Sequence, residues 1–190
     1  MSAYIAQLKY EGDGAGRLHP RRDPVWCAER FGQSVTFLPD GRMVLVGGEH
    51  EDSSDLDFCI YNDVWVFDPS GVIQIYGYPK EVFPPTDFHS ATLVGDQLYL
   101  VGSLGYWGSR VYGETQVSRL DTKTFRIESL KTSGQLPGWI YGHEARLIGS
   151  DQLEVFGGTV VTRGAASDEY SENTDTFTLN VETLEWRRAA

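Results

Sequence analysis

The sequence has few cysteines, no excess of positive charge and no long apolar run. Its two cysteines, Cys27 and Cys59, are too few for a disulfide framework. The 27 acidic residues outnumber the 16 lysines and arginines, giving a net charge of −11. This charge argues against nucleic acid or an anionic membrane as the main partner, because both attract basic surfaces. Without an apolar run of about 20 residues or a signal peptide at its start, the chain is predicted to be cytoplasmic, with reduced thiols.

Glycine and aromatic residues are abundant, which favours strands and turns over helices. Three segments of the 190-residue chain repeat one pattern, in which two short strands end in a doublet of small residues. The doublets are Gly47-Gly48, Gly102-Ser103 and Gly157-Gly158. They recur about every 55 residues, a spacing close to the length of a propeller blade.

Each repeat continues in the same way after its doublet. A long polar loop leads to an alternating strand that ends in an acid or an amide, at residues 63–68, 116–121 and 175–180. A tight turn and a short fourth strand follow. Alternation with period 2, bounded by turn residues, predicts strands, and four strands joined as a meander form a propeller blade.

These repeats resemble the kelch family, in which a Gly-Gly doublet ends the second strand and an aromatic-Asp pair precedes a turn and a Trp. The third repeat matches best, since it keeps the spacing from Leu179-Asn180 to Trp186. Residues 73–75 and 125–127 replace the Trp region in the other repeats, and Ser103 replaces one doublet glycine. The resemblance implies an all-β fold, a partial β-propeller of three four-stranded antiparallel kelch-type blades.

The predicted blades occupy residues 31–87, 88–140 and 141–190, after an N-terminal strand and a Pro/Gly/Arg-rich connector at 1–30. Propellers usually close with four to eight blades, so three blades would leave an apolar face and a strand edge at each end. We therefore expect a homodimer that completes a six-bladed ring, or association with further blades. The strand at residues 4–10 is expected to add across a blade edge as a fastener.

The loops after the doublets and the links between repeats are long, whereas the first and third turns are short. A meander places the long segments on one face, here called the crown, and long loops on a rigid scaffold are where binding usually resides. Aromatic and arginine side chains in these loops are types favoured at binding hot spots. The candidate partner-binding residues are Glu49, His50, Asp52, Asp55, Tyr106, Trp107, Arg110, Trp139, Arg163, Glu169 and Tyr170. Tyr112 and Asp168 lie in the same loops, and opposite charges in neighbouring loops can also pair with one another.

Gln33, His89 and His143 stand at equivalent positions in the first strands, which line the axis of a propeller. Two histidines and an acid could bind a metal there. The alternative, which the repetition favours, is that each His caps a strand by forming a hydrogen bond to the next blade. The acidic loop at 49–57 lacks the spacing of a calcium-binding loop.

No catalytic motif stands out in the chain. Some kelch-like propellers are copper oxidases built on a Tyr-Cys pair, but neither cysteine lies in a first strand. We therefore predict a protein-binding module without cofactor or metal, for an unidentified protein partner. A small enzyme or metal-dependent catalyst with its site at the propeller axis is the alternative.

Alternation along the strands also predicts a core between the blades. The residues expected to be buried are Val35, Phe37, Val44, Val46, Trp65, Phe67, Leu93, Leu98, Leu100, Leu120, Leu147, Val155, Phe177 and Leu179.

Overall fold

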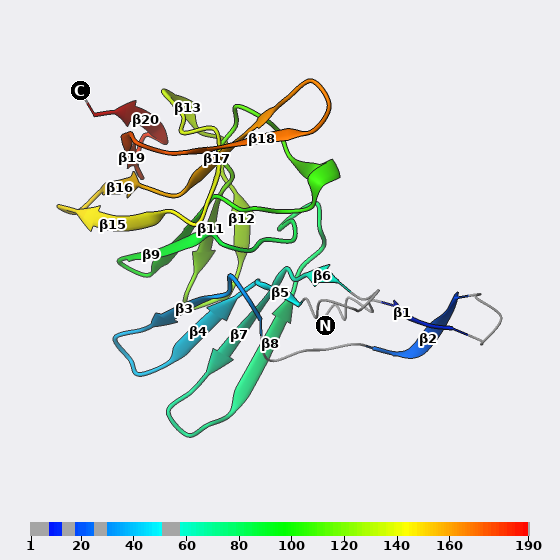
Figure 1. Ribbon diagram of the computed structural model, residues 1–190. Coiled ribbons are helices and arrows are strands. Elements are labelled where there is room, and N and C mark those ends of the chain that lie inside the picture. The colour runs from blue at the N-terminus through cyan, green and yellow to red at the C-terminus, as the bar shows by residue number, and fades with distance from the viewer. Residues whose placement is uncertain (1–7, 13–17, 25–29, 51–57, 190) are drawn as a thin grey trace.

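Three antiparallel sheets stand side by side in the computed structural model, which describes residues 8–12, 18–24, 30–50 and 58–189 (Figure 1). Blade 1 consists of β3 (Ser34–Phe37), β4 (Met43–Val46), β7 (Asp63–Phe67) and β8 (Ile73–Gly77). Blade 2 consists of β9 (Ser90–Val94), β10 (Gln97–Val101), β11 (Val117–Asp121) and β12 (Ile127–Ser129). Blade 3 consists of β15 (Glu144–Ile148), β16 (Gln152–Phe156), β19 (Thr176–Asn180) and β20 (Glu185–Arg188), with β13 (Ser133–Gly134) parallel to β20. The predicted twelve blade strands and the partial propeller are confirmed.

The tight turns after the third strands are each held by one side-chain oxygen. Oδ1 of Asp68, Asp121 and Asn180 accepts a hydrogen bond from the backbone N–H of Ser70 at 2.8 Å, Thr124 at 2.7 Å and Thr183 at 2.7 Å, respectively. Asp and Asn favour turns because their short side chains can bond to nearby backbone in this way. Hydrogen bonds, first from the Thr124 backbone and then from the Gln97 side chain, lower the pKa of Asp121 to about 2. The recurring acid or amide therefore ends the third strand and shapes the turn.

Two apolar layers join the blades. Blade 1 places Val44, Val46 and Val64 against blade 2, which meets them with a set of buried residues that includes Leu98, Leu100 and Leu120. Blade 2 turns Tyr99, Val101 and Val117 toward blade 3, which contributes Leu153, Val155, Phe177, Leu179 and Trp186. Blade 2 thus buries alternate residues of its central strands on opposite faces, as a sheet with neighbours on both sides requires.

The first glycine of a doublet lies where the next blade approaches most closely. A Cβ added to Gly47 would lie 2.2 Å from the carbonyl oxygen of Thr86, and one added to Gly102 would lie 2.3 Å from that of Ile140. Both glycines also have positive φ, which residues with a Cβ rarely adopt. At these two positions, a close neighbouring backbone and a left-handed conformation both require glycine.

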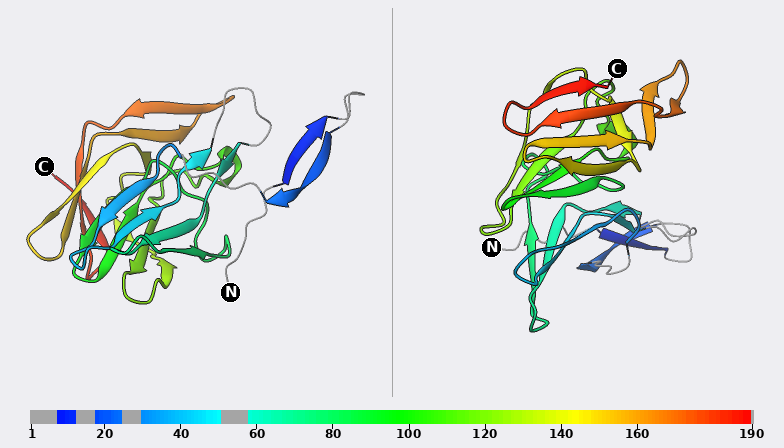
Figure 2. Two further views of the ribbon diagram at one scale, coloured as in Figure 1. Left: turned by 90° about the horizontal axis from the view of Figure 1, so that it is seen from below. Right: turned by 90° about the vertical axis from the view of Figure 1, so that its left-hand side faces the viewer.

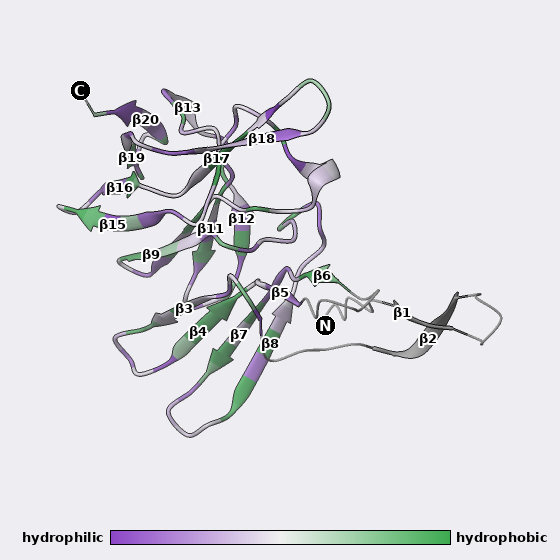
Figure 3. Ribbon diagram, in the orientation of Figure 1, coloured by the Kyte–Doolittle hydropathy of each residue, from purple (hydrophilic) through white to green (hydrophobic). Residues whose placement is uncertain are grey.

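The two outer faces of the row differ in chemistry. Strand β4 of blade 1 is hydrophobic along its length, whereas β20 of blade 3 is largely hydrophilic (Figure 3). Strand register places one set of apolar side chains on the face of blade 1 that points away from blade 2: Val35, Phe37, Met43, Leu45, Trp65, Phe67, Ile73 and Ile75. The corresponding outer face of blade 3 is mainly polar and contains Glu144, Arg146, Gln152, Glu154, Thr176 and Thr178 beside Ile148 and Phe156. The expectation of an apolar face at both ends is therefore wrong for blade 3.

Most of the predicted core is buried, with Phe67 and Leu93 partly buried. Val35, Phe37 and Leu147 are exposed instead, and the exposed fractions of Val35 and Phe37 are 51% and 75%. Val35 and Phe37 lie on the outer face of blade 1, where no described residue covers them, and Leu147 lies near the end of its strand. Trp65 shares the face of Val35 but is buried, because the guanidinium of Arg30 lies 4.8 Å from its ring centre.

The crown contains more regular structure than the expected loops. The first loop carries β5 (Glu49–His50) and β6 (Cys59–Ile60), and the second carries a short 3₁₀ helix, η1 (Trp107–Ser109). The third forms β17 (Thr159–Arg163) and β18 (Asp168–Glu172), which join β14 (Trp139–Tyr141) in a separate three-stranded sheet (Figure 2). The prediction of an irregular loop at 159–173 is wrong, because the β-branched run from Thr159 to Thr162 favours a strand.

The N-terminal strand pairs differently from the prediction. β1 (Leu8–Gly12) and β2 (Leu18–Pro24) form a hairpin that lies to one side of the blades (Figure 1). Residues 4–7 of the predicted fastener lie outside the described residues. Its described part pairs with a segment expected to be a connector, rather than with a blade edge.

Candidate functional site on the crown

The second crown loop, residues 104–114, is anchored at its base by Asp87. The buried Oδ1 of Asp87 accepts hydrogen bonds from the Gly105 N–H at 2.7 Å and from Ser103 Oγ at 3.0 Å. The Ser103 N–H donates in turn to the Ile140 carbonyl at 2.9 Å. Ser103, which departs from the Gly-Gly pattern, therefore connects the loop to the seam between blades 2 and 3.

The same loop reaches the crown of blade 1 through Tyr106. The Tyr106 hydroxyl oxygen accepts a hydrogen bond from the Ile60 N–H of β6 at 2.8 Å. The ring packs edge-to-face against Phe58, with 5.8 Å between the ring centres. The second crown loop, which belongs to blade 2, thus contacts the β5–β6 strand pair in the crown of blade 1.

Toward blade 3, the loop is held by an ion pair between Arg110 and Asp168 of β18. Arg110 Nη1 lies 2.5 Å from Asp168 Oδ2, and each side chain is only 6% exposed. Arg110 also donates to the carbonyls of Leu104 and Gly105, and the Tyr112 hydroxyl donates to Asp168 Oδ1 at 2.5 Å. The predicted pairing of opposite charges between neighbouring loops is found here.

The ion pair fixes the surroundings of two exposed aromatic rings. Tyr170 is 54% exposed, and its hydroxyl accepts a hydrogen bond from Arg110 Nη1 at 2.9 Å. Trp107 of η1 is 69% exposed. Hydrogen bonds from Tyr112 first, and then from Arg110 and Trp107, lower the pKa of Asp168. The carboxylate is therefore ionised at neutral pH and holds its three donors in place.

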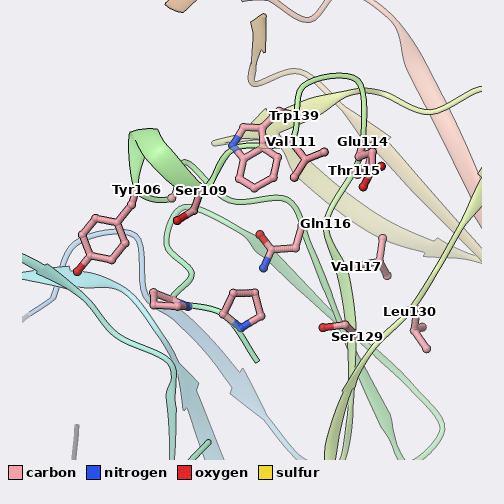
Figure 4. Close-up of a pocket in the computed structure, with 13 residues that line it drawn as sticks. Tyr106, Ser109, Val111, Glu114, Thr115, Gln116, Val117, Ser129, Leu130 and Trp139 are labelled. Carbon is pink, nitrogen blue, oxygen red and sulfur yellow. The ribbon is translucent and has the colours of Figure 1, made fainter. Parts of the chain in front are cut away.

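A cavity of about 250 Å³ opens beneath the loop (Figure 4). Tyr106 and Trp139 stand at its rim, and Gln116 projects into the space between them. Pro84, Pro85 and Val111 add apolar wall. The volume is below the 300–1,000 Å³ typical of small-molecule sites, so the cavity is of a size to take one or two side chains of a partner.

The structure places the remaining crown candidates at different depths. Glu49 and Trp139 are buried, and the Trp139 indole donates to the Leu104 carbonyl at 3.1 Å. His50 is half-buried in β5, while Arg163 and Glu169 are exposed on the β17–β18 hairpin. Asp52 and Asp55 lie outside the described residues. Of the candidates in loop two, Arg110 contacts Tyr170, whereas Tyr106 contacts the crown of blade 1. The role of each candidate in binding stays a prediction.

The axial candidates do not converge on one point. His89 Nε2 lies 2.8 Å from Ser34 Oγ of blade 1, and His143 Nε2 lies 2.9 Å from Ser90 Oγ of blade 2. Gln33 donates to the Gly47 carbonyl within its own blade. The residues that the structure describes contain no cluster of three or more His, Cys, Asp or Glu side chains arranged to hold a metal. Both histidines form hydrogen bonds between blades, but to the preceding blade rather than the next one.

Burial keeps both histidines neutral. It lowers the pKa of His89 to about 3, with a smaller contribution from the charge of His143, and the pKa of His143 to about 4. Nδ1 of each ring has no hydrogen-bond partner among the described residues. A proton on Nε2, shared with the serine, leaves only a lone pair unsatisfied at Nδ1, which costs less than burying an unpaired N–H.

Two features of this site escaped the sequence reasoning. The sequence pattern places Asp87 at the end of a link between repeats, and the structure shows that its carboxylate accepts a hydrogen bond from Ser103 of the doublet. The pattern predicts Gln116 as the start of a third strand, whereas its side chain lines the cavity. The other two repeats have an aspartate, Asp63 or Asp175, at this position. The change to an amide at Gln116 is the one feature of the sequence that sets this position apart.

Comparison with known families matches residues 19–190 to the KLHDC2/KLHL20/DRC7 Kelch-repeats domain. No curated protein matches the chain. In the described part of the chain, no helix has the length and apolar character that crossing a membrane would require. The family match covers most of the sequence and agrees with the three blades, their doublets and their turns. The chain therefore belongs to the kelch-repeat family, and its fold is a partial β-propeller.

Proposed function

We propose that the crown binds another protein, with Trp107 and Tyr170 as the main contacts. Kelch-repeat domains generally mediate protein–protein interaction. The observation that carries the proposal is that two exposed aromatic rings accompany the nearly buried Arg110–Asp168 pair, with the Tyr170 hydroxyl bound by Arg110. Aromatic rings dominate the energetics of many interfaces, and rings that are already ordered lose less entropy on binding.

The chemistry of the crown favours a partner with apolar side chains for the rings and for the cavity. Tyr106 and Trp139 at the cavity rim present apolar ring surface, and Gln116 offers an amide that can pair with a backbone group. The net charge of −11 favours a partner that is not strongly acidic.

The alternative of an axial metal-dependent catalyst has no comparable support. His89 and His143 each engage a serine of the preceding blade through Nε2, and each ring is buried. Stoichiometric metal in the purified protein would favour this alternative. A cytoplasmic location stays part of the proposal and rests on the small number of cysteines, which fits a reducing compartment.

Selection from a displayed library of random peptides tests the crown. Peptides enriched on the unmodified protein should bind at least tenfold more weakly to Trp107→Ala and Tyr170→Ala. Val72→Ala, an exposed apolar position in a turn on the opposite face, serves as the control and should leave binding unchanged. Equal binding to all four proteins would place the site elsewhere.

A further inference from the structure

Two of the three repeats hold an arginine at the start of the third strand. In blade 1, Arg30 Nη1 lies 2.5 Å from Asp63 Oδ1, and in blade 3, Arg188 Nη2 lies 2.6 Å from Asp175 Oδ1. Blade 2 has Gln116 at the same repeat position. The Gln116 side-chain amide has no hydrogen-bond partner among the described residues. Its hydrogen-bonding groups are therefore available to a ligand.

Blade 1 shows how this fold takes an arginine out of water. The Arg30 side chain is fully buried, and its guanidinium carbon lies 3.4 Å from the ring centre of Tyr61 and 4.8 Å from that of Trp65. The Asp63 carboxylate accepts hydrogen bonds from both terminal guanidinium nitrogens, at 2.5 Å and 3.0 Å. A planar guanidinium is suited to this combination, because it stacks on rings and binds a carboxylate with two parallel N–H groups.

Blade 2 has a different arrangement around the same position. The repeat position of Arg30 is occupied by Thr86, whose short side chain is buried. Gln116 projects into the cavity of about 250 Å³, between Tyr106 and Trp139 (Figure 4). Blade 2 thus presents a cavity beside the residue that corresponds to the arginine-binding Asp63 of blade 1.

The polar groups of this cavity are mainly acceptors. Among the described residues that line it, Glu114 is the one charged residue, and none is a lysine, arginine or histidine. Glu114 is exposed, and its carboxylate has no ion-pair partner in the described part of the chain. The Gln116 amide oxygen and the Ser109 hydroxyl add two further acceptors. This set favours a cationic ligand that carries several donors.

The rest of the cavity wall suits an apolar stem. Trp139 and Tyr106 contribute ring surface, and Val111 and Pro84 contribute aliphatic surface. The face of an aromatic ring attracts a cation, and long basic side chains pack their methylene groups along apolar surface while the charged end stays among polar groups. The apolar contact expected of a partner in this cavity is therefore compatible with a side chain that ends in a positive charge.

We propose that the cavity binds one arginine side chain of the protein that docks on the crown, an inference that rests on the function proposed above and refines it. Glu114 pairs with the guanidinium, the Gln116 amide oxygen accepts one of its hydrogen bonds, and Trp139 lies against its plane. Arginine fits better than lysine, because its fork of five donors reaches acceptors on two side chains while the flat group stacks on a ring. The net charge of −11 adds a general attraction for a basic segment.

Titration of the full chain with N-acetylarginine N-methylamide, followed by nuclear magnetic resonance, tests the cavity directly. The side-chain amide signals of Gln116 and the indole N–H signal of Trp139 should shift, whereas the uncharged isostere N-acetylcitrulline N-methylamide should leave them in place. Glu114→Gln should weaken binding about tenfold through the loss of a charged hydrogen-bond acceptor. Glu169→Gln removes the same charge from an exposed crown position outside the cavity and is the matched control. The dispersion of the remaining signals establishes that each variant is folded.

Peptides from the library selection described above separate this inference from the proposed function. They should share an arginine whose replacement by citrulline weakens binding about tenfold to the unmodified protein but little to Glu114→Gln. Peptides that need Trp107 and Tyr170 but share no arginine would retain the crown as a binding surface and overturn the arginine site. The absence of any shift with the arginine compound, equal shifts with the citrulline compound, or equal weakening by Glu169→Gln would also overturn it. Shifts specific to the arginine compound, together with peptides that bind Trp107→Ala and Tyr170→Ala normally, would retain the arginine site and contradict the ring contacts.

Discussion

Trp186 shows how one side chain can hold the last blade in place. It is almost fully buried between blades 2 and 3, and its indole N–H donates to Thr132 Oγ1 at 3.2 Å. Its neighbours in this layer include Tyr99 and Leu179. A ring of this size with no exposed edge contributes through both the area removed from water and the contacts it fills.

Replacing Trp186 with alanine is expected to lower the free energy of unfolding by about 3 kcal/mol, because a large cavity would remain in a packed layer. Chemical denaturation measures the loss, and Trp107→Ala, on an exposed ring, should change stability by less than about 0.5 kcal/mol. A loss below about 1 kcal/mol for Trp186→Ala would show that the layer can close around the missing ring.

The crown hairpin is the element whose packing depends most on a single polar cluster. β17 and β18 join β14, but Asp168 at the start of β18 is what connects them to the loop carrying Arg110. Val161 of β17 is buried, whereas most of β18 is exposed. The outer half of the hairpin therefore relies on the ion pair more than on apolar contact.

Asp168→Ala should loosen this hairpin while leaving the blades intact. Without the carboxylate, Arg110 keeps a nearly buried charge with no counter-ion. Backbone amides of β17 and β18 should exchange with solvent at least tenfold faster, and those of β3 and β4 should exchange at the original rate. Glu169→Ala, an exposed neighbour, is the control. Equal protection in all three proteins would mean that strand pairing alone holds the hairpin.

The blades could be predicted from the sequence because the doublets at 47, 102 and 157 and the turn residues Asp68, Asp121 and Asn180 recur in register. The structure of the crown could not be predicted in this way, because its loops do not repeat. Val160 and Val161 indicate a strand locally, but no local pattern indicates that Arg110 pairs with Asp168. The sequence contains a sign of the polar outer face of blade 3, because Glu154 occupies the repeat position that holds Val44 in blade 1 and Tyr99 in blade 2. Recognising it required knowing which alternate residues face a neighbour, and only the packing of the blades shows that.

Across the whole molecule, one buried histidine lies at each of the two contacts between blades. The stability of both contacts is therefore expected to depend on pH in the same way. His89 and His143 each have a pKa of about 6.5 when unfolded, and burial lowers it to about 3 and about 4. Above pH 6.5 neither state binds the proton, and the full stability is present. As the pH falls below 6.5, the unfolded chain takes up protons that the folded chain does not, and stability declines.

Lowering the pH from about 7.5 to about 5.5 should cost roughly 1.4 kcal/mol of stability for each histidine. Urea unfolding at several pH values measures this slope, and the window stays above the range in which most carboxylates titrate. His143→Gln, which copies the residue at the equivalent position 33, should remove about half of the slope. A slope unchanged by this substitution would mean that His143 is not buried in the neutral form.

The short strand β13 matters for how the protein behaves when concentrated or heated. It covers the outer edge of β20 with parallel pairing, so the backbone groups of that strand are not available to another chain. Among the described residues, no strand covers the outer edge of β8, which is exposed and carries Ile73 and Ile75. An open apolar edge of this kind is a template for the addition of strands from other molecules. Irreversible aggregation should therefore begin at blade 1, and the C-terminal blade should be the last to join it.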